Sequence, residues 1–258
     1  MIAEFSLLLT CGMSLMWCLM PRAQVTPGFF RIQMMIVMGL SALAMLAMGQ
    51  LTASSGEKLS SALLFEARVG SGIGLACAYI GSIFWTLGRR PGGTAAMMCV
   101  MLATMASLVC SRGGLTPLTT NEGALRFVSS FATASVLGGA VTGMLLGHWY
   151  LTAPTMSIEP LKRLTRCFLA AVVLRLAVSL VGWTWAGGQL QGGLLWTWFA
   201  LRWLAGILGP LIIAIMALRI LRYRNTQAAT GVLFAGVILT FIGEMSASLL
   251  YSELRVPL

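Results

Sequence analysis

Residues 211–218 read LIIAIMAL, with no polar residue and no alternation between polar and apolar positions. A strand of a membrane barrel needs that alternation, because one face meets lipid and the other lines the lumen. A continuous apolar run instead suits a helix, which satisfies its own backbone hydrogen bonds within lipid. The surrounding apolar segment, residues 195–220, is long enough to cross a hydrocarbon core of roughly 30 Å. It therefore predicts a transmembrane helix.

Seven further segments have the same length and apolar character. We therefore predict an all-α fold: a polytopic integral membrane helix bundle with about eight transmembrane helices, forming a single transmembrane domain over residues 1–258. Together with 195–220, the predicted spans cover residues 2–20, 32–51, 70–88, 94–112, 127–151, 167–187 and 228–251.

The composition of the chain supports the same fold class. Of the 258 residues, 58% are apolar and 9% are charged, whereas soluble domains carry about 25% charged residues. The longest polar connection runs from about residue 52 to residue 69, which is too short for a soluble domain. We therefore expect the lipid bilayer to be the main surrounding of the chain.

The formal net charge of +10 does not indicate nucleic acid as a partner. Basic residues form short clusters between apolar segments, whereas a nucleic-acid surface gathers them into one patch or stripe. Ten of them fall in the odd-numbered loops and five on the opposite side. The positive-inside rule then predicts a multi-pass protein of the cell (inner) membrane with both termini on the non-cytoplasmic side.

Two of the predicted cytoplasmic loops are strongly basic, residues 154–166 and residues 219–227. Their charge suits the anionic headgroups of the cytoplasmic leaflet. The same loops are the places where we expect membrane or peripheral protein subunits to dock.

Motifs of soluble enzymes are scarce. The chain has one histidine and no aspartate, so zinc-ligand sets and Ser–His–Asp triads are excluded, and it contains no P-loop. None of the six cysteines forms a C-x-x-C pair, and we interpret them as small packing residues. We expect no metal site and no catalysis by this chain alone.

Four ionisable residues fall within or at the rim of the apolar spans: His148, Arg175, Arg202 and Glu244. Such groups cost roughly 2.5–3.5 kcal/mol each on insertion and are functional candidates for that reason. Arg202 and Glu244 stand at similar depths on consecutive spans. We predict that they form an ion pair, which either pins the two helices together or belongs to a polar ligand site.

The end of the fifth span carries a stripe of small residues, Gly139, Gly143 and Gly147, followed by His148 and Tyr150. Glycines four residues apart share one helix face and predict close helix packing. His148 is either a solvated residue in an interfacial aromatic belt or a contact to a quinone headgroup or haem. Bis-histidine haem ligation within the chain is excluded by the single histidine.

One span contains a helix-breaking pair, Gly209 and Pro210. Proline removes a backbone hydrogen bond and predicts a kink at this depth. Such a break can line a cavity of a transporter or be a plain bend.

The topology resembles the eight-helix, quinone-interacting membrane anchor subunits of DMSO-reductase-type and polysulfide-reductase-type complexes. The resemblance lies in the spans, the external termini and the few intramembrane polar groups. It implies a membrane subunit of a respiratory or electron-transfer complex that contacts quinone, with haem a less favoured cofactor, and an iron–sulfur partner subunit. The residues that could serve the ligand site are His148, Tyr150, Arg202, Glu244 and Tyr251.

Two other functions remain open from the sequence. A small transporter or permease would make use of the Gly–Pro break and the buried pair. A non-catalytic assembly or scaffold protein would suit the small packing residues and the scarcity of polar groups.

Overall fold

The computed structural model describes residues 2–50, 60–114, 121–153, 155–186 and 192–254, and it is all-α over these residues. Eight helical segments in this part of the chain are long and apolar enough to cross a membrane, as the sequence predicts. The chain divides into two compact units, residues 1–127 and residues 128–258. We call them the N-terminal unit and the C-terminal unit and describe each by itself.

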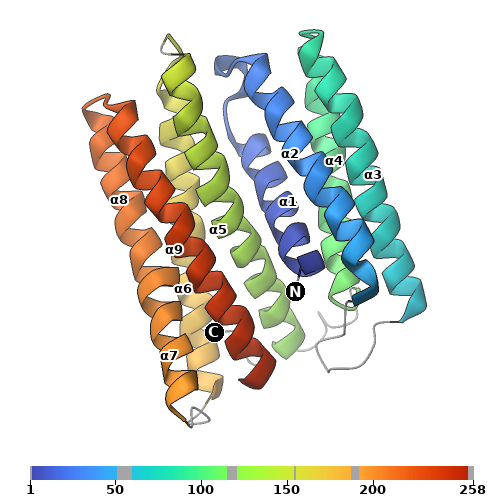
Figure 1. Cartoon of the computed structure of the whole chain (residues 1–258), viewed down its shortest axis with the longest axis vertical. Coiled ribbons are helices and arrows are strands. Elements are labelled where there is room, and N and C mark those ends of the chain that lie inside the picture. Colours follow the sequence, from blue (N-terminus) through green and yellow to red (C-terminus); the bar gives the residue numbers. More distant parts are fainter. Residues whose placement is uncertain (1, 51–59, 115–120, 154, 187–191, 255–258) are drawn as a thin grey trace. The chain divides into compact units, whose positions relative to one another are not determined.

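The N-terminal unit is a four-helix bundle. Helix α1 contacts α2 and α4, and α3 contacts the same two helices, so the four close into a ring (Figure 1). Hydroxyl groups and small residues join α3 to α4: the Ser71 and Ser107 side chains lie 2.8 Å apart, and Ser107 also donates to the Ala67 carbonyl at 2.7 Å. The helices are α1 (Ile2–Leu19), α2 (Pro27–Ala47), α3 (Ser61–Thr86) and α4 (Arg90–Ser111), with short 3-10 turns η1 (Arg22–Gln24) and η2 (Met48–Gln50).

The C-terminal unit contains most of α5 and all of the later helices. Its apolar core joins four of them: Val136 and Ala140 from α5, Phe168 and Val172 from α6, and Ala214 from α8, with Val237 of α9 packed beside them. The elements are α5 (Asn121–Thr152), α6 (Glu159–Ala186), α7 (Gly193–Trp203), the π-helical turn η4 (Leu204–Leu208), α8 (Gly209–Arg222) and α9 (Thr226–Leu254).

The helices begin where local residues can start them. Proline stands in the first turn of α2, α4 and α6, where its missing N–H costs no hydrogen bond. The Ser60 hydroxyl accepts from the Leu63 N–H at the start of α3, and the Asn225 side chain accepts from the Ala228 N–H at the start of α9. These residues cap backbone donors that a helix otherwise leaves unpaired.

Several helices extend beyond the spans predicted from hydropathy. Helix α3 begins at Ser61 rather than at residue 70, α5 at Asn121 rather than 127, and α6 at Glu159 rather than 167. Hydropathy detects only the apolar part, whereas helical hydrogen bonding continues into the interface, where Lys and Arg stems lie along the helix and their charges reach water. The basic segments 154–166 and 219–227 are therefore largely helix ends, and only short connections such as residues 223–225 remain.

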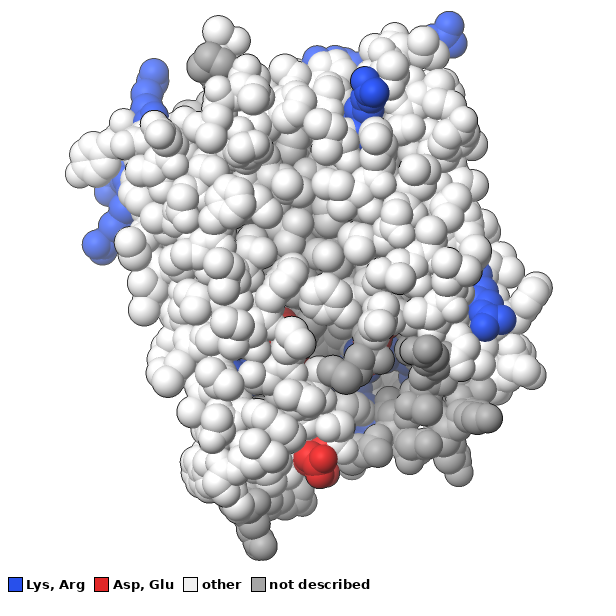
Figure 2. Space-filling model, viewed as in Figure 1, with Lys and Arg blue, Asp and Glu red and all other residues white. Residues whose placement is uncertain are grey.

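The visible surface of the molecule has the character that lipid contact requires. In the space-filling view, uncharged side chains cover most of it and few charged groups interrupt them (Figure 2). Exposed side chains on the spans include many large apolar ones, among them Phe65, Ile80, Leu102, Ile212 and Ile238.

Candidate functional site

The predicted ion pair between Arg202 and Glu244 is present. The Arg202 Nη1 atom donates to Glu244 Oε1 at 2.8 Å, and the side chains are 0% and 4% exposed. The backbones of their helices nearly touch beside the pair, because a Cβ added at Gly243 would lie only 1.9 Å from the Cα of Gly206. Glycine at both positions therefore lets α9 approach η4 closely enough for the pair to form.

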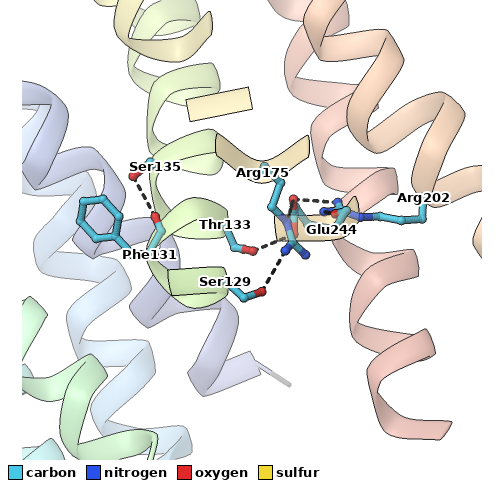
Figure 3. Close-up of polar contacts among 8 residues, drawn as sticks. Ser129, Phe131, Thr133, Ser135, Arg175, Arg202 and Glu244 are labelled. Carbon is cyan, nitrogen blue, oxygen red and sulfur yellow. Dashed lines mark hydrogen bonds and ion pairs between the residues drawn. The ribbon is translucent and has the colours of Figure 1, made fainter. Parts of the chain in front are cut away.

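A second guanidinium completes the group. The Arg175 Nε atom, on α6, donates to the same carboxylate oxygen of Glu244 at 3.4 Å, and its Nη1 atom donates to the Ser129 hydroxyl at 2.8 Å (Figure 3). The sequence marks Arg175 as an intramembrane charge but assigns it no partner. We call Arg175, Arg202 and Glu244 the buried ion cluster.

Hydroxyl groups at two further positions also form hydrogen bonds with the cluster. Thr133 on α5 donates to Glu244 Oε2 at 3.0 Å (Figure 3). Ser179 on α6 accepts from Arg202 Nη2 at 3.3 Å. The cluster thus joins α5, α6, α7 and α9. Sequence analysis missed Ser129, Thr133 and Ser179, because serine and threonine are common in spans and carry no signal of their own; the spacing of Arg175 and Ser179 on one helix face was the only hint.

The buried ion cluster lies well inside the membrane-spanning segments. Arg202 stands roughly 14 Å from the start of α7, and Glu244 roughly 15 Å from the end of α9, at 1.5 Å per residue. Charges at such depth are stable only when paired and hydrogen-bonded. One donor is left over: within the described part of the chain, the buried Arg202 Nε atom has no hydrogen-bond partner.

An aromatic cluster lies on α6 and α7, the helices that carry the two arginines of the ion cluster. The Trp183 ring lies 4.5 Å from Phe199 and 6.5 Å from Trp203 between centroids, and Phe199 also lies 5.7 Å from Trp196. Phe199 packs against Leu250 of α9 as well. We call Trp183, Trp196, Phe199 and Trp203 the aromatic cluster.

Further buried donors occur on the helices that carry these clusters. The indole Nε1 atom of Trp203 and the hydroxyl of Tyr251 are both shielded from solvent, and neither has a partner among the described residues. A buried donor without a partner costs about 1–3 kcal/mol. Together with Arg202 Nε and the Thr240 hydroxyl of α9, four buried N–H or O–H groups on α7 and α9 have no hydrogen-bond partner among the described residues.

His148 and Tyr150 lie in another part of the C-terminal unit. Thr133, which contacts Glu244, and His148 both lie on α5, roughly 22 Å apart along the helix axis. The His148 side chain is exposed, with its ring 6.4 Å from that of Phe234. The Tyr150 hydroxyl donates to the Ser157 carbonyl. The structure therefore does not bring His148 and Tyr150 together with Arg202, Glu244 and Tyr251.

The glycine stripe of α5 lies against neighbouring helices. A Cβ at Gly139 would meet Phe168 of α6 at 3.0 Å, and one at Gly147 would meet the Thr230 side chain of α9 at 2.7 Å. Gly143 is less tightly packed, with Leu233 at 3.9 Å. The first and last of the three glycines thus permit the closest approaches of α5.

The break predicted at Gly209 and Pro210 has a specific form. Residues Leu204–Leu208 form a π-helical turn in which the Gly209 N–H bonds to the Leu204 carbonyl, five residues earlier. This widened turn leads into Pro210 and begins two residues after Arg202. Such π-turns occur frequently at functional sites.

No group of three or more His, Cys, Asp or Glu side chains that could hold a metal ion occurs within the described ranges. Comparisons of the chain with protein-family models, with curated proteins and with solved structures found no match. The fold and site define a polytopic α-helical membrane protein with a buried ion cluster in its C-terminal unit.

Proposed function

We propose that the protein is the membrane subunit of an electron-transfer complex and that its C-terminal unit binds a quinone headgroup. The observation that carries this proposal is that three N–H or O–H groups, Arg202 Nε, Trp203 Nε1 and Tyr251 Oη, are buried and unpartnered. A quinone presents two carbonyl oxygens that accept hydrogen bonds, together with a flat ring that suits aromatic neighbours.

The buried ion cluster gives this site its rigidity. Glu244 holds the Arg202 guanidinium through Nη1, and Ser179 holds it through Nη2, so Nε has a defined direction. A donor whose position is already fixed loses little entropy when a ligand binds. In this proposal Glu244 and Arg175 position Arg202, and they do not contact the quinone. His148 and Tyr150 are outside the site, because they stand near the other end of α5.

Quinone binding can be measured by quenching of tryptophan fluorescence. We expect a short-chain quinone to quench the purified protein saturably. The double variant Trp203→Phe with Tyr251→Phe removes two donors and keeps an aromatic ring at each position. At about 0.5–1.5 kcal/mol per hydrogen bond, its affinity should fall roughly fivefold to a hundredfold.

The matched control is Trp149→Phe with Tyr223→Phe, since Trp149 stands beside His148, outside the proposed site, and the Tyr223 side chain is 86% exposed. This control should bind quinone like the unaltered protein. Absence of saturable quenching, or equal affinities of the two double variants, would refute the quinone site.

Membership of a complex is tested separately. Purification from native membranes should yield an iron–sulfur or other redox subunit together with this chain, and a visible spectrum would report haem. If the protein purifies alone and without redox cofactors, the assignment to an electron-transfer complex is wrong even if quinone binds.

The proposed orientation places the basic segments 154–166 and 219–227 in the cytoplasm, following the positive-inside rule. Reporter fusions after residue 224 and within residues 187–193 should then report cytoplasmic and external locations respectively. The reverse pattern would show that the orientation is the opposite of the proposed one, and it would not bear on the quinone site.

A transport function is the second candidate, and the π-helical turn favours it. A widened, proline-flanked turn next to Arg202 is the kind of irregular backbone that lines substrate paths in transporters. This candidate predicts uptake of a small organic anion by proteoliposomes, abolished by Arg202→Gln. Lack of uptake across a panel of carboxylates and phosphate would remove it.

A further inference from the structure

Sulfur atoms of α1 and α4 meet in pairs within the N-terminal unit. The Cys11 Sγ atom lies 3.9 Å from Met105 Sδ, and the Cys18 Sγ atom lies 3.6 Å from Met98 Sδ. The two cysteines are seven residues apart on α1, and the two methionines are seven residues apart on α4. The two pairs therefore stand on the same faces of two antiparallel helices, roughly 10 Å apart along the axis.

A third methionine lies between the two pairs. Met101 follows Met98 by three residues and precedes Met105 by four, so all three share one face of α4. We call Cys11, Cys18, Met98, Met101 and Met105 the sulfur ladder. From the N-terminal unit alone, the structure thus gathers two thiols and three thioethers along one helix–helix contact.

We propose that the sulfur ladder binds Cu(I). Thiolate and thioether are the soft ligands that select this ion over the harder divalent metals. With metal–sulfur bonds of about 2.3 Å, as for zinc thiolates, sulfurs 3.6 and 3.9 Å apart subtend roughly 100–115° at a shared ion. Both angles are close to tetrahedral, which leaves room for Met101 as a further ligand.

The charge balance of binding suits the surroundings. A cysteine thiol releases its proton to solvent when the sulfur–copper bond forms. The resulting thiolate carries one negative charge and Cu(I) one positive charge, while the methionine thioethers stay neutral. Each occupied pair is therefore neutral overall, which avoids the cost of a net charge within the membrane.

The Cys18–Met98 pair is the point of entry. Cys18 is the second-last residue of α1 (Ile2–Leu19), so an ion can reach this pair from the membrane interface at that end of the helix. Met101 then provides an intermediate ligand toward Cys11 and Met105. This site lies in the N-terminal unit and does not depend on the quinone proposal.

Cu(I) binding is tested on the full-length, reduced protein in detergent by competition with bicinchoninate. We expect up to two Cu(I) ions per chain, with sulfur as the coordinating element in X-ray absorption spectra. The double variant Cys11→Ser with Cys18→Ser should lower the affinity at least a hundredfold. Met98→Leu with Met105→Leu, which keeps the side-chain volume, should lower it at least tenfold.

Three controls keep the test decisive. Cys167→Ser and Met245→Leu, both in the C-terminal unit, should bind Cu(I) unchanged, and size-exclusion chromatography should show each variant intact. The variant Cys77→Ser with Cys99→Ser tests the other neighbouring thiols of the N-terminal unit. Absence of Cu(I) binding, or binding lost in this last variant and kept without Cys11 and Cys18, overturns the sulfur ladder as a copper site.

Discussion

The two units contain four spans each, yet different chemistry holds their helices together. In the N-terminal unit, hydroxyl contacts such as Ser71–Ser107 and sulfur contacts such as Cys18–Met98 join the helices, and the Glu4–Arg112 ion pair is 34% and 24% exposed. In the C-terminal unit, Glu244 and two arginines are buried together. The difference teaches that similar apolar composition permits both weak and strong polar contacts between spans.

The energetic consequences of this contrast are large. Hydrogen bonds between transmembrane helices average about 0.6 kcal/mol, whereas removing one partner of a buried ion pair costs about 3–5 kcal/mol. Removing a buried ion-pair partner in the C-terminal unit should therefore lower the unfolding free energy much more than removing an interhelical hydrogen bond in the N-terminal unit.

Glu244→Gln should have the largest effect. It leaves Arg175 and Arg202 without the carboxylate between them, and we expect a loss of about 3–5 kcal/mol in the free energy of unfolding. Unfolding in mixed micelles measures it. Glu253→Gln, exposed on the same helix, is the control. If both variants unfold like the unaltered protein, the cluster does not stabilise the C-terminal unit.

Gly243→Ala should have the second-largest effect on the free energy of unfolding. Its Cβ would meet the backbone of Gly206, which cannot move aside as a side chain could, so α9 and η4 must separate. We expect a loss of about 1–3 kcal/mol, the usual cost of overpacking. Gly231→Ala on the same helix has nothing within 4 Å of the added carbon and should be neutral. Equal thermal stability of the two alanine variants would contradict the close contact.

The Ser71–Ser107 contact of the N-terminal unit should contribute less. A double-mutant cycle with Ser71→Ala and Ser107→Ala should give a coupling free energy of about 0.6 kcal/mol. Ser82→Ala, which removes only a bond to the carbonyl of its own helix, is the matched control. A coupling above about 2 kcal/mol would erase the contrast between the two units.

The smallest effect is expected at the surface of the C-terminal unit. Glu159 and Arg166 form an ion pair whose side chains are 50% and 62% exposed. Glu159→Gln should change the unfolding free energy by less than about 0.5 kcal/mol, and added salt should abolish the difference. A larger, salt-resistant loss would show that burial does not decide the strength of ion pairs in this unit.

The sequence was most informative about features that depend on local composition. Eight helical spans follow from hydropathy alone, because every backbone group in lipid must be satisfied within its own helix. The Arg202–Glu244 pair was predictable too, since consecutive spans are usual neighbours and both residues stand at one depth. Helix ends were less predictable, because helical bonding at Ser61 or Glu159 continues past the apolar residues.

By itself, the sequence determined that this is an eight-span helical membrane protein with a small number of intramembrane charges. Only the tertiary structure decided which of them meet: Arg175 joins Glu244, while His148 stands apart with Phe234. It also decided that Cys11 meets Met105. The reason is physical: hydropathy depends on the residues within one helix, whereas side-chain contacts depend on how each helix rotates and how closely glycines let its neighbours approach.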